Sequence, residues 1–580
     1  MKRSSVALGI VLAGSGIFSA SCGGVGQNNG NHGAGGIGGF GSGGNAVGGA
    51  SLGGLDPLPP PATVDTDIFS TADRCAMCHA AEAGSSALRD AAGRDVSPFQ
   101  LWRVSMMSFS GRDPYWLAAL SHELDENPGA KETIEATCTR CHAPAAAVTH
   151  AQKGEHVTFD EIVSGTSDIA VLAREGVGCA VCHQIKPDNL GQPSSFTGNY
   201  QIGTERLMFG PHKDPFPMPM QHNVNFTPTY ATHVTDSALC ATCHTVITRS
   251  LDEAGKPNGP EVPEQVPYLE WQNSTFAAGP SARSCASCHM PTTDEDGNLI
   301  TTRISNRPPW LDARSPFGRH TLAGGNAYML GLLAENAAWT GTNVPQSAIL
   351  EGETRAKQML ETAATIQIAE AKRANGELML DIAVENHTGH KLPTAYPSRR
   401  IWVHLTLKDQ AGAVLFESGR VDDNGALVDA AGQRLDKLGT LLPHHDEITS
   451  ASEVQVYESV MSDASGAPTH VLLAATGYAK DNRILPAGWS AGHANAAMTK
   501  PVGVGNDPTF APGADHIHYR IAAPQGPLQV SAELLYQSVP PTTADVLAEV
   551  KTKAAVTFGA MMKARPPLPQ TIATTKTSVP

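Results

Sequence analysis

Ten of the eleven cysteines in this chain of 580 residues fall into five repeats of one short motif, Cys-x-x-Cys-His. Two thiols at this spacing can reach the two vinyl groups on one edge of a haem and form thioether bonds with them. The histidine that follows then falls beneath the iron as its proximal ligand. The sequence therefore predicts five covalently attached haem c groups. The motif residues are Cys75, Cys78, His79, Cys138, Cys141, His142, Cys179, Cys182, His183, Cys240, Cys243, His244, Cys285, Cys288 and His289.

Two other uses of paired cysteines explain these motifs less well. Zinc ligation gives no reason for a histidine directly after every second cysteine. A disulfide within Cys-x-x-Cys is usually redox-active and would not recur five times. Because haem attachment takes place outside the cytoplasm, we expect the chain to be exported.

The N-terminus resembles the signal peptide of a bacterial lipoprotein. Lys2 and Arg3 precede an apolar stretch that is too short to span a bilayer, and small residues then lead to Cys22. Residues 1–22 are expected to be this signal, with Cys22 lipidated. Ser19 departs from the leucine usual at that position, and an ordinary cleaved signal peptide is the alternative. We expect the protein at the periplasmic face or cell surface, and Gly23, which is not acidic, favours the outer membrane.

The remaining chain divides by composition into segments that must position the haems. Residues 23–64 are rich in Gly and Pro and predict a disordered tether. Residues 65–340 carry all five motifs and predict a cytochrome domain of short helices and loops, and residues 341–365 predict one linking amphipathic helix.

Beyond this helix the pattern becomes that of short strands separated by Gly, Asn and Asp. Residues 366–560 therefore predict an antiparallel β-sandwich of immunoglobulin-like type, and residues 561–580 a flexible tail. The fold class is α+β multidomain, a mainly helical multihaem region followed by this sandwich. The expected strands are 365–373, 377–386, 401–409, 413–419, 454–461, 469–476 and 527–538.

The acidic overall charge disfavours nucleic acid as a partner and favours redox proteins with basic patches. The formal net charge is −15, and Lys and Arg form no dense run. Such a chain is not expected to bind nucleic acid. Soluble redox proteins that dock through basic patches, or a terminal electron acceptor, are the expected partners, together with the membrane that holds the lipid anchor.

Several longer segments resemble multihaem cytochromes of the cytochrome c554 type. They include LWRVSMMSFSGRDPYWLAALSHE followed by CTRCHAP, then GVGCAVCHQI, SALCATCHTV and CASCHMP. The resemblance continues through FGRHTLAGGNAYML, NHTGHKLPTAYPSRR and KDNRILPAGW, so it covers roughly residues 70 to 540. It implies periplasmic or cell-surface electron transfer. Ammonia-forming pentahaem nitrite reductases differ because one of their motifs ends in Lys, and hydroxylamine oxidoreductases differ because they carry more haems.

The sixth iron ligand decides whether a haem only carries electrons or also binds a substrate. The expected distal ligands are His122, His233, His320, His390 and His212, the last in competition with His222. His390 is the most informative of these, because a ligand from a loop of the sandwich would clamp the two regions together. The alternative is that His390 is a structural residue of that loop.

We therefore expect an electron carrier that passes electrons through five haems between redox partners. The alternative is an oxidoreductase acting on a small nitrogen or sulfur oxyanion at one open haem, with groups such as Arg112, Tyr115 and Tyr230 nearby. A third possibility is a structural subunit of a larger cytochrome assembly. The carrier interpretation is favoured over the enzyme.

Overall fold

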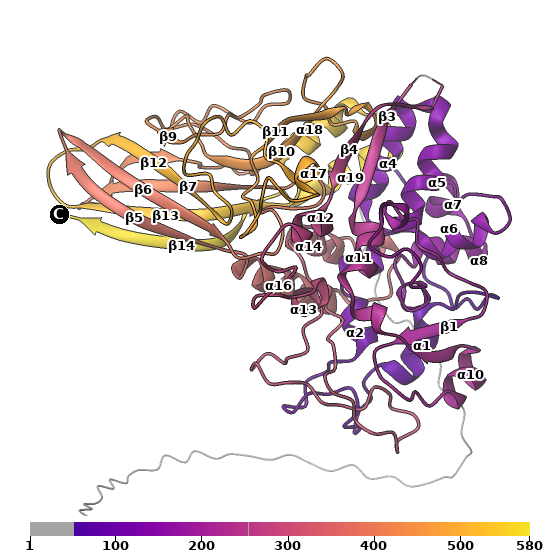
Figure 1. Cartoon of the computed structure of the whole chain (residues 1–580). Helices are drawn as coiled ribbons and strands as arrows, with labels where there is room; N and C mark the ends of the chain where they lie inside the picture. Colours follow the sequence, from indigo (N-terminus) through magenta and orange to yellow (C-terminus); the bar gives the residue numbers. More distant parts are fainter. Residues whose placement is uncertain (1–51, 253) are drawn as a thin grey trace, which may run out of the picture. The chain divides into compact units, whose positions relative to one another are not determined.

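The structure is a computed structural model that describes residues 52–252 and 254–580. Helices and loops make up the first part of the chain, and β-sheets make up the second part (Figure 1). The mixture of helices and antiparallel sheets confirms the α+β class expected from the sequence. The signal peptide, Cys22 and most of the expected tether lie outside the described residues. The haem-motif region contains these helices: α1 (Ala72–His79), α2 (Pro98–Trp102), α3 (Met106–Phe109), α4 (Pro114–Glu126), α5 (Lys131–His142), α6 (Pro144–Ala151), α7 (Phe159–Ser164), α8 (Asp168–Arg174), α9 (Cys179–Cys182), α10 (Met218–Val224), α11 (Ser237–His244), α12 (Pro267–Gln272), α13 (Cys285–His289), α14 (Ala327–Glu335), α15 (Ala337–Thr340) and α16 (Gln346–Glu361).

The described end of the expected tether is part of the folded unit. Leu58 and Val64 are buried, and the Leu58 N–H donates to the Trp339 carbonyl at 2.8 Å. These apolar side chains offset the entropy of ordering the backbone, which a stretch of Gly alone could not do. The prediction of a tether as far as residue 64 is therefore wrong for residues 52–64.

Two pairs of strands lie within the helical region. β1 (Leu207–Gly210) pairs in parallel with β2 (Thr227–Tyr230), and β3 (Val246–Leu251) pairs antiparallel with β4 (Pro257–Gln265). Neither pair was expected from the sequence. Pro263, Pro260 and Pro257 obscure the strand pattern of β4, because proline is normally depleted from strands.

Two sheets face one another in the C-terminal region and enclose an aliphatic core. One sheet has the order β11-β10-β7-β13-β14 with β8 also paired to β7, and the other has the order β5-β6-β12-β9. Their bounds are β5 (Ala364–Ala374), β6 (Glu377–Asn386), β7 (Arg400–Asp409), β8 (Val414–Ser418), β9 (Glu447–Ile448), β10 (Val456–Ser462), β11 (Gly477–Asp481), β12 (Ala514–Ala522), β13 (Leu528–Gln537) and β14 (Gln570–Val579). Alternate residues of the two sheets, such as Ile382 and Leu405, are fully buried in one cluster. β9 pairs with β12 in parallel, so the sheets are not wholly antiparallel.

Residues 469–476 do not form the expected strand. They contain a short 3-10 helix, η4 (Leu472–Ala474), and the N–H groups of Leu472 and Leu473 donate to the Glu123 carboxylate at 2.6 and 3.4 Å. A buried acceptor on α4 therefore takes the hydrogen bonds that a strand would have given to a sheet.

The C-terminal segment is also ordered, contrary to the expected flexible tail over 561–580. β14 pairs with β13 along nearly its whole length, from Leu528↔Val579 to Tyr536↔Gln570. Its polar, Thr-rich sequence hides the strand, because most of its alternating side chains stay partly exposed.

Two helices between β13 and β14 return to the helical region. They are α18 (Pro541–Glu549) and α19 (Lys553–Ala564), and α19 packs against α4. Phe558 of α19 is fully buried and stacks on Tyr115 of α4, with ring centroids 5.2 Å apart. The described residues thus form one compact unit rather than separable domains.

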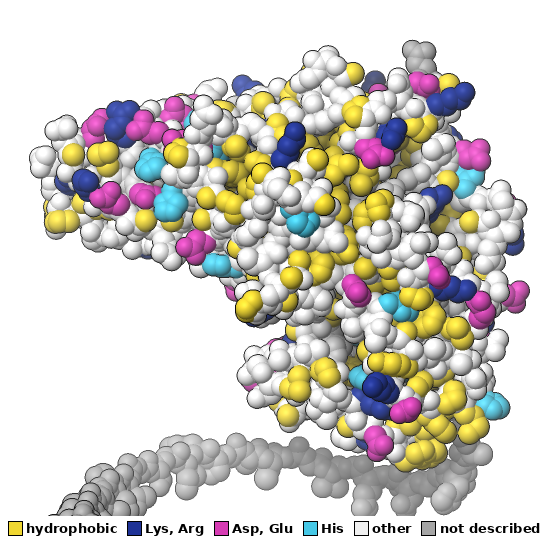
Figure 2. All heavy atoms as spheres, in the orientation of Figure 1, with side chains coloured by type: hydrophobic (Ala, Val, Ile, Leu, Met, Phe, Trp, Pro, Cys, Tyr) yellow, Lys and Arg dark blue, Asp and Glu magenta, His cyan; other side chains and the backbone are white. Residues whose placement is uncertain are grey.

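No helix in the described part of the chain is long and apolar enough to cross a membrane. On the face drawn in Figure 2, the basic side chains are scattered among acidic and polar ones.

Candidate functional site: five haem-binding motifs

Each Cys-x-x-Cys-His motif lies on a short helix. The first, second, fourth and fifth motifs end α1, α5, α11 and α13, and the third motif forms α9 with His183 as its C-terminal cap. Helical backbone places the two cysteines nearly one turn apart on one face, with the histidine beside the second of them. This is the local geometry that attachment to one haem edge requires.

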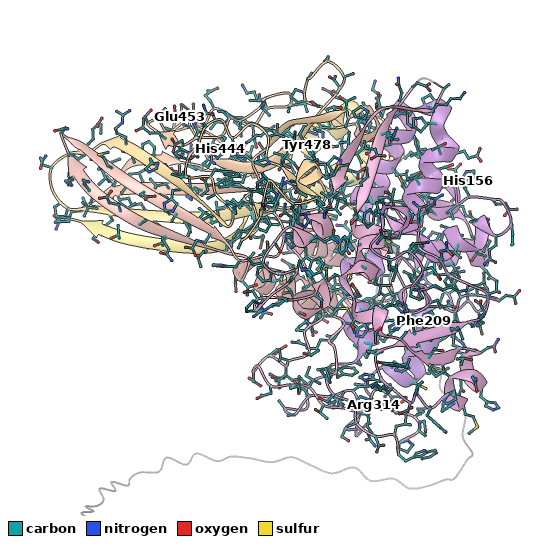
Figure 3. All side chains as sticks on the ribbon, viewed as in Figure 1. His156, Phe209, Arg314, His444, Glu453 and Tyr478 are labelled. Atoms are coloured by element: carbon teal, nitrogen blue, oxygen red, sulfur yellow. The ribbon has the colours of Figure 1, made fainter. Side chains whose placement is uncertain are left out.

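Four of the five motif histidines have their Nδ1 atom fixed by a backbone carbonyl from a distant part of the chain. The ring Nδ1 atoms of His79, His183 and His289 lie 2.7, 2.7 and 2.6 Å from the carbonyl oxygens of Ile304, Phe209 and Ala323. The His142 Nδ1 atom lies 3.4 Å from the Ser110 carbonyl oxygen. An Nδ1–H that donates in this way leaves Nε2 unprotonated and directed away, ready to bind a metal. Figure 3 labels Phe209 within the helical region.

Burial keeps these imidazoles neutral, as metal ligation requires. It lowers the pKa of His142 to about 4, and it lowers the pKa of His79 and His183 as well. The indole of Trp116 lies parallel to the His142 ring at a centroid distance of 4.4 Å and supports it from α4.

Thiols from different motifs lie against one another. The Cys75 thiol contacts that of Cys179, and this contact, together with burial, raises the pKa of Cys179 well above its usual range. Equivalent contacts join Cys141 to Cys243 and Cys240 to Cys285. These contacts join the motifs into two groups, one of the first and third motifs and one of the second, fourth and fifth. Cys182 of the third motif lies close enough to Cys243 of the fourth for its charge to raise the pKa of Cys182, to which burial contributes most.

The donor set fits covalent haem. All ten described cysteines are free thiols, so none is used in a disulfide. Free thiol pairs beside neutral imidazoles with an available Nε2 are what haem c attachment needs. The residues that would hold haem are those of the motifs, and haem would supply one-electron redox chemistry there.

His320 lies across from the proximal histidine of the third motif. Its ring and that of His183 have centroids 6.2 Å apart and planes inclined by 23°. At this spacing His183 and His320 would both be able to hold one haem iron. Burial lowers the pKa of His320 to about 4, and the nearby His183 and His79 lower it further.

His390 belongs to the loop that follows β6, and it is partly buried close to the fifth motif. Its Nδ1 atom is engaged by the Lys391 carbonyl at 2.8 Å and by the Thr388 hydroxyl at 3.1 Å, which leaves Nε2 available. Burial lowers the pKa of His390 to about 4, and the charge of His289 acts in the same direction. The loop expected to reach the haem region therefore does so.

A buried ion-pair network fixes this loop to α12. The Lys391 Nζ atom lies 2.6 Å from Asp481, and the Arg483 guanidinium lies 2.7 Å from Asp481 and 3.1 Å from Glu270 of α12. The second Glu270 oxygen accepts from the Lys391 N–H at 3.1 Å and from the Thr394 hydroxyl at 2.5 Å. All four charged side chains are at most 5% exposed.

The other three expected distal ligands have different surroundings. His122 on α4 forms an ion pair with Glu126 at 3.8 Å and lies near His470 of the β region. The Nε2 atom of His233 lies 2.8 Å from the Ile185 carbonyl, so that nitrogen is already engaged. His212 is partly exposed in a loop near Arg314. None of these contacts joins them to a motif histidine.

The groups named for the enzyme alternative have contacts of other kinds. The Arg112 guanidinium is buried and donates to the carbonyls of Arg174, Pro59 and Thr340, which is a structural role. Tyr230 is exposed. Tyr115 is partly buried beside Tyr396, with ring centroids 5.8 Å apart.

Two polar clusters were missed by sequence reasoning. In the β region, His444, Asp507 and Asp515 converge within 4.8 Å, and Gln455, Asn482 and Tyr457 satisfy them with hydrogen bonds. Glu264 of β4 and Glu123 of α4 are also both buried, and the charge of Glu123, together with burial, raises the pKa of Glu264. No motif marks either cluster, because their members are far apart in the sequence.

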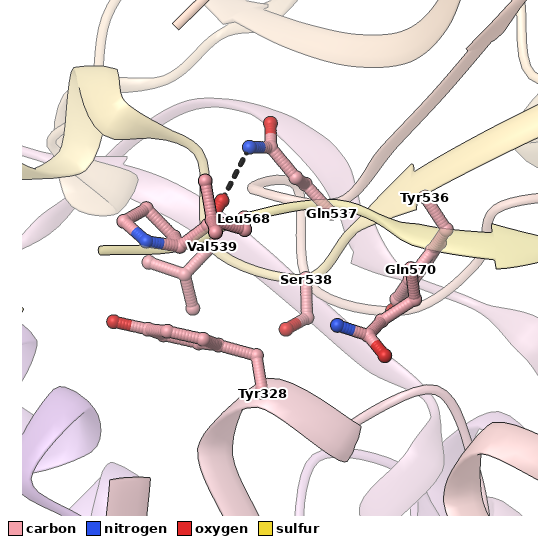
Figure 4. Close-up of a pocket in the computed structure, with 8 residues that line it drawn as sticks. Tyr328, Tyr536, Gln537, Ser538, Val539, Leu568 and Gln570 are labelled. Atoms are coloured by element: carbon pink, nitrogen blue, oxygen red, sulfur yellow. Dashed lines mark hydrogen bonds between the residues drawn. The ribbon is translucent and has the colours of Figure 1, made fainter. Parts of the chain in front are cut away.

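One further feature is a crevice between α14 and the end of β13. Figure 4 shows Tyr328, Tyr536 and Ser538 on its walls, with the Gln537 side chain donating to the Pro567 carbonyl at 2.5 Å. The crevice is closed by its own side chains and offers no space for a ligand.

The fold and the five motifs can be compared with those of known proteins. No protein-family model and no curated protein matches the chain. Among solved structures, a penta-heme cytochrome c552 from Thermochromatium tepidum is similar at a TM-score of 0.50 and 16% identity, covering 88% of this chain and 99% of that chain. The likeness extends over both regions of the chain and supports the multihaem cytochrome fold.

Proposed function

We propose that the protein is an electron-transfer cytochrome of the c554 type that passes electrons through five covalently bound haems. The observation that carries this proposal is the contact between thiols of different motifs, the first with the third, the second with the fourth, and the fourth with the fifth. Haems attached to touching thiols lie close enough for electrons to pass between them. His320 and His390 would complete the coordination of two irons and keep them as carriers.

The protein would exchange electrons with redox proteins or a terminal acceptor outside the cytoplasm. The acidic balance of the chain favours partners with basic docking patches. A lipid on Cys22 would hold the protein at a membrane, with the outer membrane favoured. Export is required because haem c is attached outside the cytoplasm.

A second candidate is the reduction or oxidation of a small oxyanion at an open haem. Arg399 supports this second candidate. Burial is the main cause that lowers the pKa of His244, and the nearby positive charge of Arg399 lowers that pKa further. An arginine on the distal side of a haem could hold an anion.

The deciding experiment has two parts. Haem is counted in the purified protein by pyridine haemochrome absorbance, and the dithionite-reduced Soret band is then recorded before and after carbon monoxide is added. Five haems and an unchanged band support the carrier, because every iron then has six ligands. A shifted fraction of the band favours the second candidate, and fewer than five haems contradicts both.

A further inference from the structure

The indole of Trp116 lies flat against the ring of His142, the proximal histidine of the second motif. The two ring planes are inclined by 1°, and their centroids are 4.4 Å apart. Trp116 is 9% exposed, so this contact is inside the protein. Within residues 52–252 and 254–580, no indole, phenol or phenyl ring stacks in this way on the histidines of the other four motifs.

The Nδ1 atom of His142 also has the longest hydrogen bond among the motif histidines that are bonded to carbonyls. It lies 3.4 Å from the Ser110 carbonyl oxygen. The corresponding distances for His79, His183 and His289 are 2.7, 2.7 and 2.6 Å. Since N–H···O bonds are usually about 2.7–3.2 Å long, the bond of His142 is the weakest of the four.

The main chain does not keep His142 away from this carbonyl. The Ser110 hydroxyl donates to the His142 carbonyl at 2.9 Å, so the two residues are held side by side. The Tyr200 hydroxyl donates to the Arg140 carbonyl at 2.7 Å and fixes the end of α5. The length of the Nδ1 hydrogen bond is therefore decided by where the imidazole ring is held, and the indole occupies one face of that ring.

The helix α4 gives Trp116 little freedom to move. Its neighbour Tyr115 stacks on Phe558 of α19, with ring centroids 5.2 Å apart. One turn further along the helix, the Ser121 hydroxyl lies 2.7 Å from the Thr552 hydroxyl. The indole is thus a fixed surface against which the imidazole ring lies.

The hydrogen bond at Nδ1 affects an iron that is bound at Nε2 of the same ring. An acceptor on the Nδ1–H makes the imidazole a stronger donor to the metal. A stronger donor stabilises the ferric state relative to the ferrous state and lowers the reduction potential. A weak Nδ1 hydrogen bond has the opposite effect, so the reduction potential is higher.

We propose that Trp116 is a positioning residue that raises the reduction potential of the haem attached at Cys138 and Cys141. It acts through His142, whose ring it holds where the Ser110 carbonyl accepts only a long hydrogen bond. This inference rests on the proposed function, since it needs a haem at the second motif.

The test compares the holoprotein with Trp116→Leu and Trp116→Phe by potentiometric titration and by electron paramagnetic resonance of the ferric form. In Trp116→Leu the imidazole is free to approach the Ser110 carbonyl, so one of the five potentials is expected to fall and one low-spin signal to shift. Trp116→Phe keeps a flat ring against the imidazole and is expected to retain most of the original potential.

Trp339→Leu is the control for the loss of a buried indole. Trp339 is 7% exposed, its Nε1–H donates to the Leu55 carbonyl at 3.2 Å, and its ring stacks on no motif histidine. The five potentials should therefore stay unchanged in this variant. Trp116→Met, with a longer and more adaptable side chain, repeats the test if Trp116→Leu does not retain its haems.

Three results would overturn the inference. They are unchanged potentials in a five-haem Trp116→Leu or Trp116→Met protein, an equal fall in Trp116→Phe, and the same fall in Trp339→Leu. An unaltered protein that lacks five haems or cannot be reduced would instead contradict the proposed function.

Discussion

At the scale of single residues, the histidines divide by what holds their Nδ1 atoms. The proximal His79 and His183 are oriented by carbonyls, and so is His390, although no motif identifies it. A carbonyl on Nδ1 fixes both the tautomer and the direction of the ring. This feature separates His390 from His233, whose Nε2 atom is the engaged one.

Replacement of His390 by Ala is expected to leave one of the five haem irons without its sixth ligand. The variant should show carbon monoxide binding in about a fifth of the reduced haem, because one axial ligand is lost. His387→Ala is the matched control, since His387 lies in the same loop and its Nε2 atom contacts only the Thr365 hydroxyl at 3.1 Å. Equal carbon monoxide binding in both variants would show that His390 is a structural residue of the loop.

Replacement of His320 by Ala is expected to open a different iron. The readout is the low-spin ferric signal in electron paramagnetic resonance, where one component should be lost and a high-spin signal should appear. Because His320 faces His183 at 6.2 Å, a spectrum identical to that of the unaltered protein would contradict this ligation.

At the scale of elements, α4 connects the two regions of the chain. Trp116 stacks on a proximal histidine, Glu123 binds η4, and Tyr115 stacks on Phe558 of α19. Asp113 begins the helix by accepting the Tyr115 N–H at 2.9 Å, a normal N-terminal cap. This one helix therefore contacts the second haem-binding motif and also packs against residues of the β region and of α19.

Phe558→Ala is expected to lower the free energy of unfolding by about 3–5 kcal/mol, as for other large aromatic side chains lost from a core. Phe558 is 0% exposed. Chemical denaturation followed by far-UV circular dichroism measures the change. Val556→Ala, on an exposed position of the same helix, should cost much less, and similar losses in the two variants would contradict the packing described for α19.

At the scale of the whole molecule, buried charges join the haem-bearing part to the sheets. Asp481 lies between Lys391 and Arg483, and together they bring Glu270 of α12 against the β region. These opposite charges hold the pKa of Asp481 at about 2. Removal of one member of such a buried set is costly because the others are left unpaired.

Asp481→Ala is therefore expected to cost about 3–5 kcal/mol of stability. Because the described residues form one compact unit, Soret absorbance and far-UV circular dichroism should report a single shared transition, which the variant shifts as a whole. Asp463→Ala, in an exposed turn, is the control. Separate transitions of the two signals would show that the regions unfold independently.

The sequence by itself identified the candidate haem sites, because covalent attachment needs residues that are close together in the chain. Five motifs therefore predict five helical haem sites, and alternation of apolar residues predicts strands such as β6, β7 and β13. The helix α16 and the mixed α+β character also follow from such local patterns.

Only the tertiary structure decided which groups meet across long distances. His320 faces His183, and His390 reaches the fifth motif, because the chain folds back on itself. The same long-range contacts explain the errors at η4 and β14, where a distant carboxylate and a neighbouring strand override the local pattern. Local chemistry is encoded in neighbouring residues, whereas axial ligands and buried charges depend on contacts that spacing alone does not reveal.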